Sequence, residues 1–109
     1  MPTVYKTLGQ SNPSATTNAS LYTVPATTST VVSTVTVCNQ ASTAGTFRIA
    51  IRPAGASIAA QHYIAYDTPI AANDTIALTL GITLATTDVV TVYASSATMS
   101  FSAFGSEIS

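Results

Sequence analysis

The sequence predicts an all-β domain, a seven- to eight-stranded antiparallel β-sandwich or jelly-roll-like barrel with an extended N-terminal arm. Hydrophobic residues recur at every second position in several short runs, which is the period of a half-buried strand. Clusters of turn-forming residues separate these runs at the short spacing typical of a sandwich or barrel. Alanine alternates with Thr, Ile and Val, so β-propensity outweighs helix propensity.

The arm is expected at residues 1–20 and a single β-sandwich domain at residues 21–109. The arm is mostly polar, and its only apolar cluster is Val4, Tyr5 and Leu8. Ordering a backbone costs on the order of 1–2 kcal/mol per residue, which so polar a segment offsets only by binding a partner. We therefore expect the three apolar side chains to anchor the arm on a neighbouring subunit or another protein surface.

Seven runs after the arm are expected to be strands. Pro25 stops the first run, at residues 21–24, because proline has no N–H to donate to a sheet ladder. The second and third runs, at residues 31–38 and 46–52, place Val, Phe or Ile on one face and Thr, Arg or Ala on the other. The fourth carries Ile64 and Tyr66 on one side and Tyr63 on the other, and the last three alternate large apolar with small or polar residues. In order, the runs are residues 21–24, 31–38, 46–52, 62–67, 75–80, 89–93 and 98–104.

The same alternation predicts the core, since one face of each strand is buried. Only residues 57–61 suggest a helical turn. The side chains expected to face the core are Val31, Val35, Val37, Phe47, Ile49, Ile51, Ile76, Leu78, Leu80, Val90, Val92, Met99 and Phe101.

Charge is the unusual part of the composition. Only 6% of the 109 residues are charged, against about 25% in a typical domain. Three basic and four acidic residues cannot neutralise a phosphate backbone, so we expect no nucleic-acid partner. A net charge near zero favours association, which suits a subunit of an assembly. No apolar run approaches the ~20 residues of a membrane helix, so we expect no membrane partner.

No pattern of catalytic or metal-binding residues emerges. The single histidine, His62, and the single cysteine, Cys38, are far apart, and no serine lies in a Gly-x-Ser-x-Gly motif. Asp74 and Asp88 each precede a strand, where aspartate commonly bonds its own backbone in a turn. We expect no catalytic residue, no cofactor and no metal, a strand-end or subunit-contact role for His62, and a buried, inert Cys38 thiol.

The candidate interface residues in the domain are Arg48, Arg52 and Tyr63. The two arginines share one face of an expected strand, roughly 13 Å apart. Two interpretations stay open for them. They either lie on a solvated face, where they can pair with Asp67, or form an intersubunit contact, because arginine is enriched at interfaces.

Four tyrosines offer a second kind of surface. Aromatic faces with polar tips suit both carbohydrate rings and protein interfaces. The chain has no Trp and few carboxylates to bind sugar hydroxyls, so a protein contact is favoured and carbohydrate binding is kept as an alternative. The tyrosines are Tyr22, Tyr63, Tyr66 and Tyr93.

Several stretches together resemble a family of small virion proteins of tailed bacteriophages. The resemblance covers nearly the whole chain, including LGQSNPSATT in the arm. It implies a β-sandwich subunit of a particle, and it carries no catalytic or ligand residues. The stretches are LYTVP, VVSTVTVCN, TFRIAIRPAG, QHYIAYDTPIAANDT, LTLGITLATTDVVTVYAS and SFSAFGSEI.

The expected function is that of a non-enzymatic virion structural protein, above all a capsid decoration or cement subunit. A neck, tail, baseplate or fibre module is the alternative of the same class, and a carbohydrate-binding module is the alternative of another class. The expected partners are further copies of the chain, with a trimer favoured, and other virion proteins. The expected location is the virion, assembled in the host cytoplasm.

Overall fold

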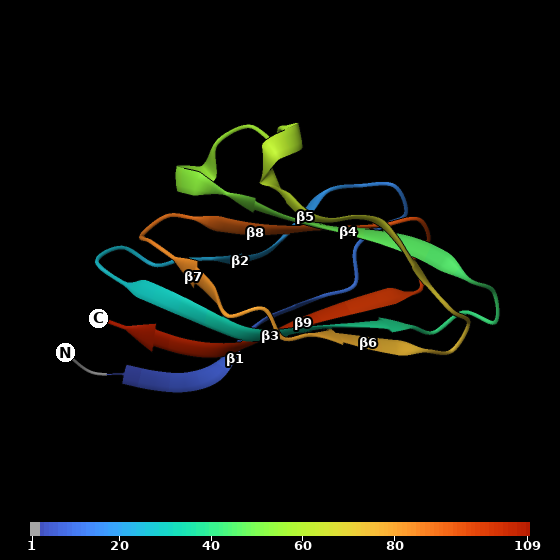
Figure 1. The fold of residues 1–109 in the computed structure, drawn as a ribbon, viewed down its shortest axis with the longest axis horizontal. Helices are drawn as coiled ribbons and strands as arrows, with labels where there is room; N and C mark the ends of the chain where they lie inside the picture. The colour runs from blue at the N-terminus through green and yellow to red at the C-terminus, as the bar shows by residue number, and fades with distance from the viewer. Residues whose placement is uncertain (1–2) are drawn as a thin grey trace.

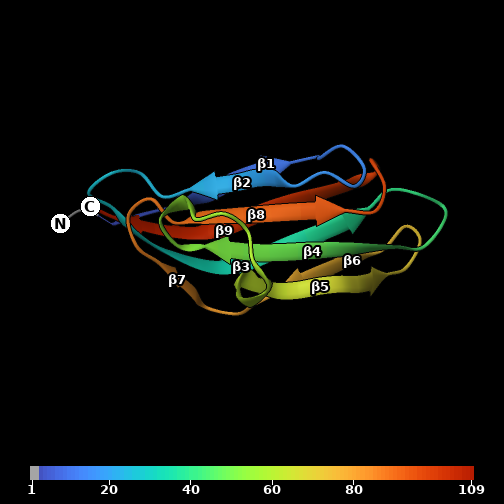
Figure 2. The same ribbon diagram turned by 90° about the horizontal axis from the view of Figure 1, so that it is seen from above.

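The computed structural model describes residues 3–109 and consists of two antiparallel sheets packed face to face (Figures 1 and 2). One sheet has the strand order β1-β9-β3-β6, with β7 also paired to β3, and the other has the order β2-β8-β4-β5. The predicted all-β sandwich is confirmed. In chain order the strands are β1 (Thr3–Ser11), β2 (Ala19–Thr23), β3 (Ser29–Asn39), β4 (Gly45–Arg52), β5 (Tyr63–Ile70), β6 (Thr75–Leu78), β7 (Ile82–Leu84), β8 (Val89–Ala94) and β9 (Met99–Ile108).

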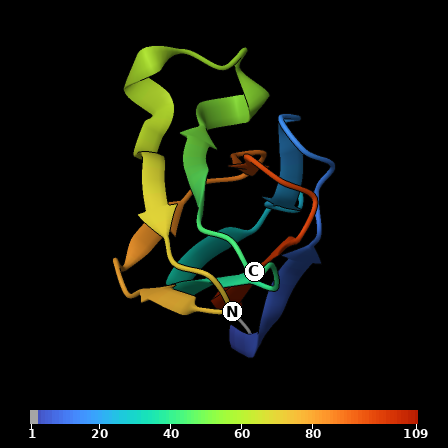
Figure 3. The ribbon, with the colours of Figure 1, turned by 90° about the vertical axis from the view of Figure 1, so that its right-hand side faces the viewer.

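Two short 3-10 turns, Pro53–Gly55 and Ala60–His62, lie in the connection between β4 and β5. The connection stands away from the outer side of the β2-β8-β4-β5 sheet (Figures 1 and 3). The helical turn expected at residues 57–61 corresponds to the second of these. None of the helical turns in residues 3–109 is long and apolar enough to cross a membrane.

The core lies between the two sheets and joins side chains from both. Phe47 of β4 and Phe101 of β9 pack edge to face, with ring centroids 6.3 Å apart. Ile49, Val92 and Met99 are fully buried around them. The inward faces of β4, β8 and β9 therefore agree with the alternation in the sequence.

The core differs from the expectation along β3. The pairing of β3 with β9 shifts between Val32 and Thr34, which marks a β-bulge. A bulge adds one residue to a strand and so reverses the side-chain alternation before it. Val32 is consequently fully buried, whereas Val31, expected in the core, is only half-buried.

Four further core expectations do not hold fully. Ile76 and Leu78 of β6 are half-buried and pack against the core. The strand expected over residues 75–80 ends at Leu78, and Leu80 lies beyond it with 52% of its surface exposed. Ile51 is half-buried at the end of β4, where the pairing with β5 has already ended. The alternation in the sequence continues to Leu80 although β6 has ended, and to Ile51 although only β8 still pairs with β4 there.

The expected arm is not separate from the sandwich over the described residues. Thr3–Ser11 forms β1 and pairs antiparallel with β9 of the same chain. Beyond β1, the Asn12 amide donates to the carbonyls of Met99 at 2.6 Å and Ala97 at 3.0 Å. This polar segment is ordered mainly by backbone and amide hydrogen bonds, with few apolar side chains buried, which is why composition alone predicted an arm. Residues 1–2 lie outside the described part.

Candidate functional site

An aromatic cluster surrounds Arg48 on the outer face of the β2-β8-β4-β5 sheet. The guanidinium carbon lies 4.2 Å from the ring centroid of Tyr66 and 4.2 Å from that of Tyr93. Arg48 Nε donates to Asp67 Oδ1 at 2.7 Å and Nη2 to Oδ2 at 3.4 Å. Tyr63 packs edge to face on Tyr66, with centroids 4.8 Å apart. The hydrogen bonds to Asp67 raise the pKa of Arg48 further above its ordinary value, so the guanidinium stays protonated and paired with the carboxylate.

A bulge in β5 assembles this cluster. Phe47 pairs with Thr68 and Ile49 with Ala65, so two β5 residues, Tyr66 and Asp67, lie opposite Arg48. Asp67 adopts a left-handed conformation with φ of 47°, which is unusual for a residue other than glycine. The bulge therefore brings an aromatic ring and a carboxylate to the same arginine, as bulges commonly do where a side chain must be redirected.

A groove of about 610 Å³ adjoins the cluster. It lies beneath the connection between β4 and β5. His62 shapes this connection, because its buried imidazole accepts the Ala59 N–H at Nδ1 over 3.0 Å. This is the strand-end role expected for His62. The groove is lined by Ile58, Ala59, Ala60, Tyr63 and Tyr66.

Arg52 has a different role from Arg48. Its Nε donates to Thr91 Oγ1 at 2.9 Å, and Nη1 donates to the Ala56 carbonyl at 3.2 Å. These bonds hold the connection after β4 against β8. The two arginines predicted as candidate interface residues therefore do not form one site, and the interpretation in which Arg48 pairs with Asp67 agrees with the geometry.

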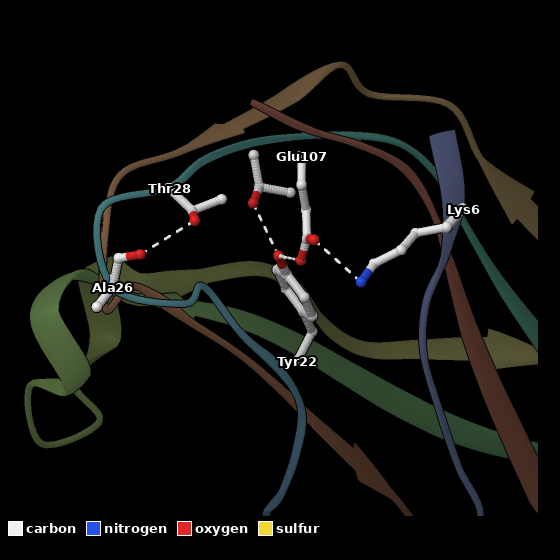
Figure 4. Close-up of polar contacts among 6 residues, drawn as sticks. Lys6, Tyr22, Ala26, Thr28 and Glu107 are labelled. Carbon is white, nitrogen blue, oxygen red and sulfur yellow. Dashed lines mark hydrogen bonds and ion pairs between the residues drawn. The ribbon is translucent and has the colours of Figure 1, made fainter. Parts of the chain in front are cut away.

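A second polar cluster lies between β1, β2 and the end of β9 (Figure 4). Lys6 Nζ is 3.0 Å from Glu107 Oε1. The Tyr22 hydroxyl donates to Glu107 Oε2 at 2.5 Å and shares a 2.8 Å hydrogen bond with Thr30 Oγ1. The bond from Tyr22, followed by that from Lys6, lowers the pKa of Glu107. Burial, followed by the bond to Glu107, raises the pKa of Tyr22 to about 12.

The three apolar residues expected to anchor the arm point in different directions. Val4 and Tyr5 are 50% and 84% exposed. Leu8 instead packs against the core of its own chain, because a register shift between Thr7 and Gly9 turns it inward. Tyr5 also lines a shallow groove of about 390 Å³ on the outer face of the β1-β9-β3-β6 sheet, together with Lys6, Val31, Ser33, Phe104, Gly105 and Ser106.

The remaining candidates have local structural roles. Asp74 accepts the backbone N–H of the next residue, and Asp88 accepts those of Ala54 and Ala85, as expected for turn aspartates. Cys38 is half-buried rather than buried, because neighbours on either side of it in β3 occupy the core. Across residues 3–109, no three metal-binding side chains lie together.

Comparison with protein-family models and with curated proteins found no match. Comparison with solved structures found a similarity to one described as the structure of infectious bursal disease virus Gx strain, with a TM-score of 0.47 and 14% sequence identity. The alignment covers 97% of this chain and 30% of that chain. The present chain thus spans less than a third of the length of the protein it matches. A similarity at this level assigns no function.

Proposed function

We propose that this protein is a non-enzymatic virion structural subunit that decorates or cements a capsid through packing contacts. The resemblance of its sequence to small virion proteins of tailed bacteriophages supports this role. So does the β-sandwich, which offers sheet edges and outer sheet faces to neighbouring proteins.

One observation carries the proposal: each of the seven charged side chains is bonded within its own chain. Four of them form two ion pairs. The other three bond neighbouring backbone or hydroxyl groups. Acid–base chemistry and the binding of charged ligands both need convergent free charges. The surface left for contact consists mainly of uncharged groups, namely hydroxyl, amide, aromatic, aliphatic and backbone groups, which suit protein–protein packing.

The copy number and position of the protein in purified particles test the proposal. Many copies spread over the capsid surface are expected for a decoration subunit. A small set confined to one vertex or to the tail favours the neck, tail, baseplate or fibre alternative. Absence from purified particles would contradict every virion role.

Carbohydrate binding is the second candidate, because Tyr63 and Tyr66 border the 610 Å³ groove. The neighbouring rings are less suited to it. Arg48 lies against one face of Tyr66 and one face of Tyr93, where a sugar ring would stack. A glycan screen with the wild type and with Tyr63→Ala distinguishes the roles, since only a carbohydrate-binding module gives a signal that the substitution removes.

A further inference from the structure

Five strands lie at sheet edges, β1, β6 and β7 in one sheet and β2 and β5 in the other, and they differ in how well their edges are protected. Natural sheets protect edges with short strands, prolines or bulges. β7 has only three residues, β6 has four, and β2 has five with a register shift. β5 contains Pro69 and the left-handed Asp67. β1 has nine residues and contains no proline, and its bulge lies at Leu8. Thr3–Thr7 is therefore left as the longest uninterrupted edge segment, with Lys6 as its one charged residue.

Only the first half of β1 is open to a partner. At Gly9 the two sheets approach so closely that an added Cβ would lie 2.1 Å from the Leu21 carbonyl oxygen. β2 therefore covers β1 there, and the bulge at Leu8 separates this part from the segment Thr3–Thr7. All five residues of the segment are exposed. Alternate residues of Thr3–Thr7 direct their backbone N–H and C=O groups away from β9, towards the open edge.

We propose that Thr3–Thr7 is the surface through which two copies of this chain pair, antiparallel and edge to edge, about a two-fold axis at Tyr5. In this register Tyr5 lies opposite Tyr5 of the second copy. Val4 lies opposite Lys6 of the second copy, and Thr3 opposite Thr7. The two sheets then continue as one across the dimer.

Charge complementarity supports a second copy as the occupant. Val4 pairs with Glu107 in its own sheet, so the row across the dimer reads Glu107, Val4, then Lys6 of the second copy. Glu107 and that lysine are two strand spacings apart, roughly 10 Å between Cα atoms, a span that two long side chains bridge. Each Glu107 then lies between two lysines, and each Lys6 between two carboxylates.

The aromatic groups on the other face agree with this register. Tyr5 is the most exposed large apolar side chain among the described residues, at 84%, and Phe104 beside it is 37% exposed. The axis brings the two Tyr5 rings together as a cross-strand aromatic pair, which stabilises sheets. Two other registers are less favourable. A two-fold axis at Lys6 would place the lysines of the two copies directly opposite each other. A shift of the pairing by one residue would place the core-facing side chains of one copy on the same side as the outward-facing side chains of the other.

A two-fold contact closes after two copies. The geometry therefore favours a dimer in place of the trimer that we expected from the sequence. The pairing is a property of the isolated chain in solution, so it stands or falls separately from the virion role.

Sedimentation of the purified protein over a range of concentrations tests the pairing. The wild type is expected to form dimers, and Tyr5→Lys to weaken them by roughly tenfold or more, because two like charges replace an aromatic pair. Leu80→Lys is the matched control, since Leu80 is also an exposed apolar residue, 52% exposed, but lies outside β1. Circular dichroism verifies that both variants fold. A wild type that stays monomeric, or equal weakening by both substitutions, would overturn the proposal.

Disulfide cross-linking in a Cys38→Ala background tests the register. Residues directly opposite in an antiparallel pair have Cβ atoms roughly 4.5–5.5 Å apart, near the ~3.5–4.5 Å of a disulfide. Tyr5→Cys alone should give covalent dimers on mild oxidation, and Thr7→Cys alone should not. A mixture of Thr3→Cys and Thr7→Cys should cross-link again. Cross-linking of Thr7→Cys as readily as Tyr5→Cys would disprove the register.

Discussion

At the residue scale, Glu107 is the most consequential charged group of the chain. Its carboxylate accepts hydrogen bonds from Tyr22 and Lys6 and so ties β9 to both β2 and β1. Tyr22 also shares a hydrogen bond with Thr30 at the start of β3. Four strands therefore meet at one polar cluster, and its protonation state affects the free energy of unfolding.

The cluster predicts that the free energy of unfolding falls at both ends of the pH range, in an acid limb governed by Glu107 and an alkaline limb governed by Tyr22. The pKa of Glu107 is lower in the folded state, so its stabilisation is present above the ordinary carboxyl pKa and is lost as pH falls through the lowered value. The pKa of Tyr22 is raised from 10.0 to about 12, so its stabilisation is present below pH 10 and is lost as pH rises towards 12. Urea unfolding across pH measures both limbs.

Single substitutions at either partner test both limbs. Glu107→Gln should remove the acid limb and reduce the alkaline limb, and Tyr22→Phe should remove the alkaline limb and reduce the acid limb, because each group shifts the pKa of the other. Tyr22→Phe should also cost about 1–3 kcal/mol at neutral pH, because it leaves the buried Thr30 hydroxyl without this partner. If both variants lost stability with pH in the same way as the wild type does, groups other than Glu107 and Tyr22 would govern the pH dependence.

The Arg48 cluster shows where sequence reasoning ends at this scale. Pairing between Arg48 and Asp67 was one of two interpretations of the sequence, because a strand partner for Arg48 was expected nearby. The stacking of Tyr66 and Tyr93 on the guanidinium was not foreseen. Tyr93 lies directly opposite Arg48 in β8. The Tyr66 contact depends on a bulge that places two β5 residues opposite one β4 residue, and alternation carries no information about which residue is left unpaired.

At the element scale, bulges and strand ends together account for the differences between the expected and observed core residues. β8 and the first half of β9 keep an uninterrupted alternation, and their core residues were predicted correctly. β3 contains a register shift at Ser33, and the face before it was assigned to the wrong direction, with Val31 expected in the core in place of Val32. β1 contains a shift at Leu8, but it was expected to be an arm, so no inward face was assigned to it. The β3 shift lies opposite Gly105, where an added Cβ would be 2.0 Å from the Val31 carbonyl oxygen.

Gly105→Ala should therefore destabilise the sandwich by roughly 1–3 kcal/mol or more, because the β3 backbone must move. Gly81→Ala is the matched control. Gly81 has a positive φ of 63° but nothing within 4 Å of an added Cβ, so this variant measures the backbone strain alone, about 1–2 kcal/mol. Equal unfolding free energies for the two variants would mean that the close approach at Gly105 does not constrain the bulge.

At the scale of the whole molecule, stability depends on one core shared by both sheets. Ile49 is fully buried there, and an aspartate in its place would bury an unpaired charge. Ile49→Asp should therefore unfold the domain, as measured by loss of the far-ultraviolet β signal and of a cooperative urea transition. Leu80→Asp, at an exposed position, should retain both. A folded Ile49→Asp protein would contradict the assignment of the core.

The overall architecture was predictable because a period of two and frequent turn residues suffice to specify a sandwich. The position of residues 3–11 in the sandwich was not predictable from the sequence. Their order comes from pairing with β9, at the other end of the chain, and composition does not encode a partner so distant in sequence. The open edge of β1 is a product of the same long-range pairing.

Because of the close approach at Gly9, β1 is held against β2 from Gly9 onward, whereas its first half, Thr3–Thr7, can separate from β9 without moving the other sheet. Amide hydrogen exchange should therefore be rapid over Thr3–Thr7 and slow from Gly9 onward, since fraying needs no separation of the sheets but opening at Gly9 does. If a second copy occupies the edge, protection of Thr3–Thr7 should rise with protein concentration while that of Gly9–Ser11 stays constant. Uniform exchange along β1 would show that the strand detaches as a whole.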